Sequence, residues 1–266
     1  MIIAGVGVTG AIAAALIDRV VDWRTAYFIG GGMGFALLLL RIGVRESGMF
    51  EQVRAAKGVS RGDIGKLFTS SDRAKRYACV ILSGVPVWYL IGILVVRSPK
   101  IAKDLGLAEP VVAGTAVMMA YIGLAIGDVA SGVLSQLLQS RRKALAVFLV
   151  LSAVSTAVYF LVAGRSLGAL YASCLLVGIG GGYWAVFVTT ASEQFGTNLR
   201  STVTTTAPNF VRGSLVLVSA GVGIFEPSLG PWKAAAVVGV ITLSIALLSI
   251  LPLKESFGHD LDFVEK

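Results

Sequence analysis

The sequence predicts an all-α membrane protein, a polytopic bundle of about eight transmembrane helices. Hydrophobic residues make up 56% of the 266 residues and charged residues only 14%, whereas soluble domains carry about 25% charged residues. Apolar stretches of about 20 residues, the length that crosses a bilayer, recur along the whole chain. Because only helices and closed barrels satisfy their backbone hydrogen bonds in lipid, we expect these stretches to be helices.

The predicted spans differ in length and in their flanking charges. The first is short and no basic residue precedes it, so we expect a helix cut near its start rather than a signal peptide. Both cysteines lie in apolar stretches and the one histidine, His259, lies in the polar tail, so we expect no metal site and no cofactor. The spans are 2–17, 26–43, 77–96, 111–137, 144–164, 167–190, 201–225 and 233–252.

Basic residues are concentrated in the loops of one side. Nine lysines and arginines lie within 41–76, and a second cluster covers 141–143. The positive-inside rule places these two segments, 191–200 and the C-terminal tail in the cytoplasm. We therefore expect a multi-pass protein of the plasma (inner) membrane. The net charge of +8 is divided among short loops, so nucleic acid is not an expected partner.

Residues 23–47 and 232–256 form an internal repeat. Aligned without gaps, the two copies share seven identical residues of 25. Each begins with a tryptophan and a basic residue, and each ends with a basic residue followed by Glu-Ser. Chance similarity between two leucine-rich helices would not produce these matching ends. Both copies cross the membrane in the same direction, as in transporters whose halves are related by an axis normal to the membrane.

The repeat divides the chain into two unequal parts. From Tyr77, where the second set of spans begins, to Trp232 is 155 residues, whereas only 22 residues precede Trp23. We therefore expect four helices to be missing before the first copy, and we expect these missing N-terminal helices to be a partner of this chain. The predicted domains are 1–43, the last two helices of the N-terminal half; 44–76, a cytoplasmic basic linker; 77–252, the C-terminal six-helix half; and 253–266, a cytoplasmic tail.

Two six-helix halves joined by a long basic loop resemble the major facilitator superfamily of secondary transporters. Three stretches carry the resemblance: DWRTAYFIGGG through RES, GDVASGVLSQLLQSRRK, and EQFGTNLR. The second stretch departs from the family's pattern at Gln136 and Leu137, where Asp and Arg are usual. The resemblance implies that the chain comprises helices five to twelve of a transporter that works by alternating access.

The same resemblance implies a cytoplasmic gate. Its members would be Arg141 and Arg142 from the second stretch and Glu193 and Arg200 from the third. In this interpretation they form an ion-pair cluster that holds one conformation closed. From the residues alone, the same side chains are equally consistent with loop charges near lipid headgroups.

Arg212 is the most informative residue of the sequence. It lies about halfway along the otherwise uncharged run 201–225, and a charge at such a depth costs about 2.5–3.5 kcal/mol. Helical spacing aligns it with other polar residues, and we expect this stripe to face protein or water and not lipid. We expect Arg212 and Asn209 to bind the anionic group of a solute. The stripe comprises Thr202, Thr205, Asn209, Arg212 and Ser219.

Asp128 is the only acid well inside an apolar stretch. A carboxylate in a medium of low dielectric constant either finds a cation or takes up a proton. One interpretation is therefore a proton-coupling residue. The alternatives are a structural ion pair, a contact with a helix end, or a partnership with Arg212.

Four aromatic residues are predicted to shape a cavity for the solute. Trp88 and Tyr89 follow a proline, which removes a backbone hydrogen bond and favours a kink. Trp184 follows closely after three consecutive glycines, which let the backbone bend. Tyr121 shares a helix face with the buried acid. Ordinary packing is the alternative for each of the four.

Small residues recur at a spacing of four. Such patterns permit close contact between membrane helices. No Gly-Lys-Ser/Thr follows any of them, so a nucleotide-binding loop is excluded. The patterns are Gly30 and Gly34; Gly123, Gly127 and Ser131; and Gly178 and Gly182.

These observations predict a transporter that moves a small polar or anionic solute by alternating access, coupled to a proton gradient as in symport. One alternative is a non-transporting membrane sensor or receptor on a transporter scaffold. Another is a membrane-embedded lipid-modifying enzyme, although such an enzyme would be expected to cluster several His, Asp or Glu residues. We expect no enzymatic activity, and the expected partners are the solute and the lipid bilayer.

Overall fold

The computed structural model describes residues 21–41 and 64–258, together with residues 10, 17, 263 and 265. The described residues form helices and turns, with no strand among them. The predicted all-α class is therefore confirmed. Most of the predicted span 2–17 and residues 44–63 of the predicted linker lie outside the described residues.

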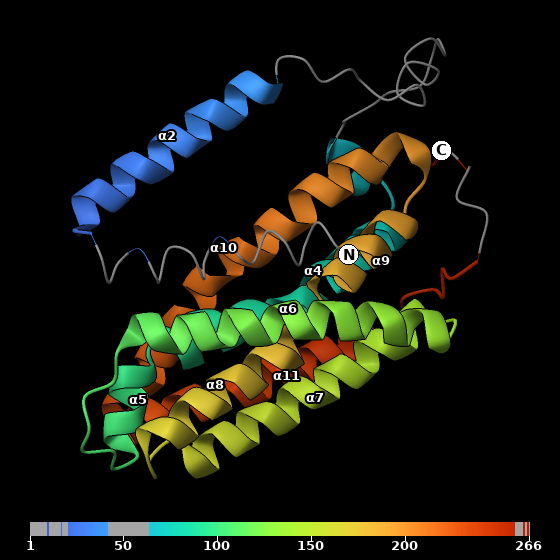
Figure 1. The fold of residues 1–266 in the computed structure, drawn as a ribbon. Helices are drawn as coiled ribbons and strands as arrows, with labels where there is room; N and C mark the ends of the chain where they lie inside the picture. The colour runs from blue at the N-terminus through green and yellow to red at the C-terminus, as the bar shows by residue number, and fades with distance from the viewer. Residues whose placement is uncertain are drawn as a thin grey trace.

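Figure 1 shows the helical elements, and short connections join those from η1 to α11. In chain order they are α2 (Trp23–Arg41), η1 (Ile64–Leu67), α4 (Ser71–Tyr89), η2 (Leu90–Val95), α5 (Ser98–Asp104), α6 (Ala113–Leu137), α7 (Arg141–Val162), α8 (Leu167–Gly181), α9 (Trp184–Glu193), α10 (Thr197–Leu229) and α11 (Pro231–Ser249).

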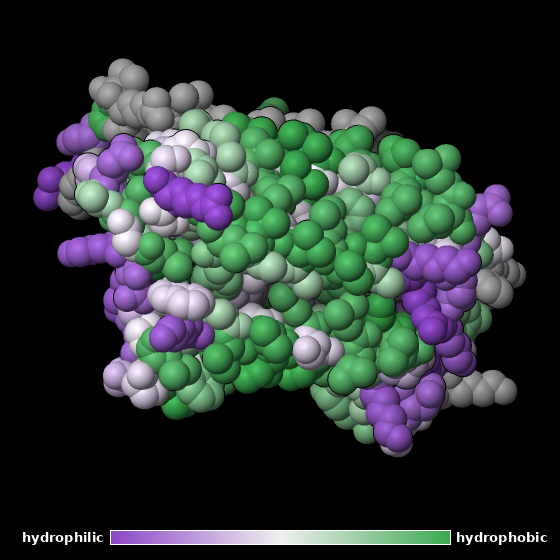
Figure 2. Space-filling model, turned by 90° about the horizontal axis from the view of Figure 1, so that it is seen from below, coloured by the Kyte–Doolittle hydropathy of each residue, from purple (hydrophilic) through white to green (hydrophobic). Residues whose placement is uncertain are grey.

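Six helices of the described part are long and apolar enough to cross a bilayer. They are α4 with η2, α6, α7, α8 with α9, α10 and α11, and they correspond to the last six predicted spans. The surface agrees, because Figure 2 shows a broad apolar band with hydrophilic residues gathered at its two ends. α2 is not one of the six, so its crossing of the membrane stays a prediction.

The long helices run between two ends of the bundle, which we name by a residue at each (Figure 1). The Arg141 end holds the α6–α7 turn and the α9–α10 turn. The Asp104 end holds α5, the α7–α8 turn and the α10–α11 turn. These names make no assumption about which end faces the cytoplasm.

α2 and α11 are the two copies of the internal repeat. Both have 19 residues, and at the offset of the repeat their bounds differ by one residue. The prediction of two corresponding helices is thus confirmed. α11 packs within the bundle, whereas α2 lies apart from it (Figure 1).

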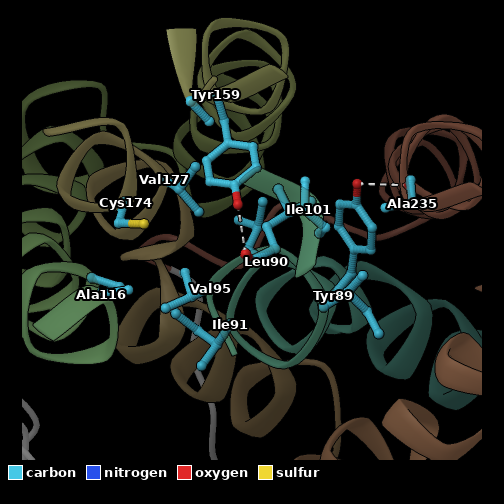
Figure 3. Packing of buried hydrophobic residues seen from close by; sticks show 14 of the residues in the cluster. Tyr89, Leu90, Ile91, Val95, Ile101, Ala116, Tyr159, Cys174, Val177 and Ala235 are labelled. Carbon is cyan, nitrogen blue, oxygen red and sulfur yellow. Dashed lines mark hydrogen bonds between the residues drawn. The ribbon is translucent and has the colours of Figure 1, made fainter. Parts of the chain in front are cut away.

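The first span of the bundle is irregular, as its proline predicts. α4 contains Pro86 and continues into η2, a π-helical turn. Hydroxyl groups of two tyrosines from neighbouring helices donate to backbone carbonyls of this span. Tyr159 reaches the carbonyl of Leu94 at 2.9 Å (Figure 3), and Tyr183 reaches that of Ser83 at 3.0 Å. These bonds tie the irregular span to α7 and to the residue before α9.

The predicted span 167–190 is two helices and not one. α8 ends at Gly181 and α9 begins at Trp184. At the break, the backbone of Gly182 touches α6, and a methyl group on Gly182 would lie 2.5 Å from the Cα of Gly127. Consecutive glycines allow this close approach, and their low helix propensity favours an end at this point.

Glycines also bring α6 and α8 into backbone contact along their length. A methyl group on Gly178 would lie 2.0 Å from the carbonyl oxygen of Ala120, and one on Gly123 would lie 2.1 Å from that of Leu175. The small-residue patterns of 123–131 and 178–182 are therefore confirmed as contact surfaces. Gly30 and Gly34 on α2 meet no neighbour.

Replacing Gly178 by alanine should destabilise the protein. Alanine normally favours a helix over glycine by about 0.5–1 kcal/mol, but this methyl group would overlap the carbonyl oxygen of Ala120, and overpacking costs about 1–3 kcal/mol. Thermal unfolding of the protein in detergent measures the effect. Gly168→Ala on the same helix is the control, since a methyl group there meets nothing within 4 Å. A Gly178→Ala variant as stable as Gly168→Ala would contradict the predicted overlap.

Candidate functional site

Several of the predicted site residues meet at the middle of the bundle. Buried side chains form two clusters, one toward each end, and α10 contributes Val211 to the cluster at the Arg141 end and Val218 to the other. Arg212 therefore lies close to the level where the clusters meet. We call Arg212, its partners Asn209 and Trp184, and Trp88, which packs against the same cluster as Trp184, the central site.

Uncharged groups hold the guanidinium of Arg212. Its central carbon lies 5.4 Å from the ring centroid of Trp184, within the range of a cation–π interaction. Its Nη1 donates to Oδ1 of Asn209 at 3.1 Å, and Asn209 donates to the carbonyl of Thr205 at 2.9 Å. Within 21–41 and 64–258, Arg212 has no ion-pair partner. Most of its five N–H donors therefore remain open to an anion.

The polar stripe of α10 lies mostly on an uncovered face. Thr205, Asn209 and Arg212 are exposed, Ser219 is half-buried and Thr202 is buried. α10 is the least buried of the six spans and lies at the edge of the bundle (Figure 1). No described helix covers this face at Arg212.

Trp88 lies on α4, which packs against α10. It lies one turn after Gly84, where a methyl group would be 2.9 Å from side-chain carbons of Phe187 and Val211. Its half-buried ring packs against the same cluster as Trp184. The indole nitrogen of Trp88 is buried, and no hydrogen-bond acceptor for it occurs in the described residues. The central site thus holds a buried, unused N–H donor.

The other two predicted aromatic residues lie elsewhere. Tyr89 is fully buried and its hydroxyl donates to the carbonyl of Ala235 in α11 at 2.9 Å (Figure 3). Tyr121 is half-buried and packs against the cluster at the Asp104 end. Trp184 therefore contacts Arg212 and Trp88 packs against the same cluster as Trp184, whereas Tyr89 and Tyr121 have packing partners elsewhere.

Asp128 is buried against the start of α9. It is 3% exposed, and its Oδ1 accepts the backbone N–H of Ala185 at 3.1 Å. It makes no ion pair with Arg212, since the salt bridges of the described residues all join other groups. Of the alternatives left by the sequence, the contact with a helix end is the one this geometry matches.

A second polar cluster lies at the Arg141 end. Nε of Arg141 pairs with Glu193 at 3.3 Å, and its Nη1 donates to the hydroxyl of Ser135 at 2.9 Å. The guanidinium of Arg142 donates to the carbonyl of Leu253 at 3.5 Å. Arg141 and Glu193, two members of the gate that the resemblance implies, therefore form an ion pair. Arg142, in contrast, binds a backbone carbonyl rather than an acid.

The segment that follows α11 completes this cluster. Glu255 accepts the N–H of Arg141 at 2.9 Å at the start of α7 and also binds the hydroxyl of Ser140. Ser256 donates to Glu193 at 2.6 Å. The sequence contained a signal for these residues, because the repeat ends in Glu-Ser in both copies. Their partners, however, come from distant parts of the chain.

The same segment reaches two further helices. Glu265 pairs with Arg76 of α4 at 3.1 Å, and its backbone carbonyl accepts from the side chain of Asn198 at 3.1 Å. Arg200 donates to the carbonyl of Ser192 at 3.2 Å. All these contacts lie among helices α4 to α11 and the segment that follows them. They brace the Arg141 end of the bundle, and a gate between two halves stays a prediction.

Comparison with known families decides the identity of the fold. The family model described as Major Facilitator Superfamily matches residues 1–219. The chain belongs to the major facilitator superfamily. The superfamily assignment and the six apolar spans together make it an integral, multi-pass membrane protein and, in general terms, a membrane transporter. A comparison with curated proteins gives no match.

Because the chain is, in general terms, a membrane transporter, the donor groups described above are candidates for binding a solute. The chemistry of the central site consists of N–H donors, aromatic rings and one guanidinium. Within the described part of the chain, no group of three His, Cys, Asp or Glu residues is placed to hold a metal ion. The central site is suited to binding a solute by hydrogen bonds and charge.

Acid should weaken the contact between Glu255 and α7. Burial raises the pKa of this carboxyl, but the hydroxyl of Ser140 and three backbone N–H groups outweigh burial and lower the pKa below its ordinary value of 4.5. A lowered pKa stabilises the fold at pH values above 4.5, and this stabilisation is lost as the pH falls through the folded-state pKa. Melting temperatures of wild type and Glu255→Gln should therefore differ at pH 7, and the difference should shrink as the pH falls from 4.5 through the lowered folded-state pKa. A difference that persists at low pH would contradict this role.

Proposed function

We propose that the protein transports a small anionic solute by alternating access, with the central site as its binding site. Arg212 carries the proposal. A guanidinium at the middle of a membrane span costs about 2.5–3.5 kcal/mol, and the described residues supply a ring and an amide but no carboxylate to offset it. A bound anion would form charge-assisted hydrogen bonds with it.

The depth of the site supports transport. Binding sites of secondary transporters lie near the bilayer midplane, where both sides of the membrane can reach them in turn. Arg212 lies at the level where the two buried clusters meet. In this proposal, the exposed face of α10 that carries Arg212 lines the solute site on the side of one half.

Trp88 supplies a second donor for the same solute. A buried N–H without an acceptor costs about 1–3 kcal/mol, so a group that remains unpaired needs a reason. In this proposal the indole N–H of Trp88 is satisfied when the solute is bound. The anion then contacts Arg212, Asn209 and Trp88, with the ring of Trp184 behind the guanidinium.

The proposal also includes the orientation of the protein in the membrane and the helices that would complete the solute site. The positive-inside rule supports a cytoplasmic position for the Arg141 end, in the plasma (inner) membrane. The exposed face of α10 supports a contact with the other half of the transporter, whose helices are the expected partner. A proton gradient is the proposed driving force, and it is tested by whether its collapse stops accumulation.

Replacing Arg212 by glutamine should abolish binding of an anion but not folding. The probes are labelled acetate, succinate and citrate, tested for counterflow in proteoliposomes with labelled glucose as the neutral comparison. We expect flux of at least one anion in wild type and a loss of at least about tenfold in kcat/KM in Arg212→Gln, since hydrogen bonds to charged groups contribute about 1.5–3 kcal/mol. Arg212→Lys should retain part of the activity.

Arg165→Gln is the matched control, since Arg165 is an exposed arginine at the Asp104 end. Equal loss in both glutamine variants would contradict a specific role of Arg212. Binding of an anion without any flux would favour the sensor or receptor alternative.

Replacing Trp88 by phenylalanine should weaken solute binding without lowering stability. The ring remains for packing, but the N–H donor is lost, so KM should rise by about tenfold if the anion accepts this bond. The melting temperature without solute should stay equal or increase, because an unpaired buried donor is removed. Trp232→Phe near the Asp104 end is the control. An unchanged KM in Trp88→Phe would exclude the indole N–H from the site.

A further inference from the structure

α9 begins in the middle of the bundle, and its first backbone N–H groups need acceptors there. The first turn of any helix leaves such groups without an intrahelical acceptor. Tyr183, at the position before α9, provides no side-chain hydrogen bond to them. Oδ1 of Asp128 accepts the N–H of Ala185 at 3.1 Å.

The capped turn carries the ring that holds Arg212. Trp184 is the first residue of α9, and its ring lies 5.1 Å from that of Phe187 between ring centroids. The guanidinium of Arg212 stacks on the ring of Trp184 at 5.4 Å. A continuous path therefore runs from Asp128 through the first turn of α9 to Arg212.

Backbone contact fixes the acid relative to this turn. Gly127, the residue before Asp128, lies against Gly182, two residues before Trp184. A methyl group on either glycine would overlap the backbone of the other segment, at 2.4 Å from the carbonyl oxygen of Ile179 for Gly127. Asp128 and the start of α9 therefore hold one relative position.

We infer that Asp128 is a positioning residue for the solute site, which caps α9 and thereby holds Trp184 beneath Arg212. The inference rests on the proposed function and explains how the guanidinium of Arg212 is held in position. It assigns Asp128 a different role from proton coupling. In this role the side chain must accept hydrogen bonds, whereas a coupling residue must exchange a proton.

Replacing Asp128 by asparagine distinguishes the positioning role from proton coupling. Asparagine and aspartate are about equally good at the start of a helix, whereas alanine is much poorer. Asp128→Asn keeps an oxygen acceptor of the same size but cannot take up a proton at neutral pH. Asp128→Ala loses the acceptor as well. Ser131→Ala is the control, because that buried hydroxyl donates to the carbonyl of Asp128 within α6 and does not reach α9.

The first readout is transport of the three labelled carboxylates in proteoliposomes under an imposed pH gradient. We expect Asp128→Asn and Ser131→Ala to keep gradient-driven uptake with KM within about twofold of wild type. Asp128→Ala should raise KM by about fivefold or more, with a smaller change in kcat per folded protein. Retained counterflow with loss of gradient-driven uptake in Asp128→Asn would overturn the inference in favour of proton coupling.

The second readout does not depend on transport. The fluorescence of Trp184 is obtained by subtracting the spectrum of the same protein with Trp184→Phe. We expect Asp128→Ala to make Trp184 more accessible to acrylamide quenching, and Asp128→Asn and Ser131→Ala to leave it unchanged. Unchanged quenching in Asp128→Ala would overturn the positioning role even if the anions are transported.

The two readouts distinguish the two proposals. If none of the carboxylates is transported by wild type, the proposed function fails, while the quenching of Trp184 still decides whether Asp128 holds α9. If Asp128→Ala yields no folded protein, Asp128→Asn decides alone. Wild-type quenching and gradient-driven uptake in that variant support positioning, and loss of either one contradicts it.

Discussion

The backbone contact between α6 and α8 is the constraint on which the rest of the structure depends. Gly123 and Gly178 leave no room for even one methyl group at this contact. Lipid tails are as apolar as the side chains of the helices, so close packing and not the hydrophobic effect holds two such helices together. At the end of the contact, Gly127 meets Gly182, and there α8 stops and α9 starts. The position of the central site therefore depends on where this glycine-mediated contact ends.

Three helix starts in the described part of this fold are satisfied by acids from other segments. Asp128 of α6 binds the start of α9, Asp104 of α5 binds the start of α11 at 3.0 Å, and Glu255 binds the start of α7. A carboxylate suits the positive end of a helix dipole and its free N–H groups. Only Asp128 does this far from either end of the bundle. Long-range caps of this kind join the ends of helices that are distant in sequence.

Much of this architecture was predictable because membrane helices are encoded locally. Apolar length predicted the six spans, and glycine spacing predicted that 123–131 and 178–182 would be contact surfaces without saying which helices would meet. The charge of Arg212 led to the proposed site, whose role stays a prediction. The break before Trp184 and the partner of Asp128 were not predicted, since both depend on which helix lies opposite. Tyr89 could not be distinguished from Trp88 in sequence, because neighbouring residues of a helix point in different directions.

The contact between Arg76 and Glu265 has a consequence for the order of assembly. The two residues are 189 positions apart, so α4 leaves the ribosome long before its acidic partner exists. At synthesis rates of about 5–20 residues per second, the arginine waits roughly ten seconds or more for its partner. The Arg141 end therefore closes after the helices are made. Until then, the ends of α4, α7 and α10 at this side of the bundle lack the segment that joins them.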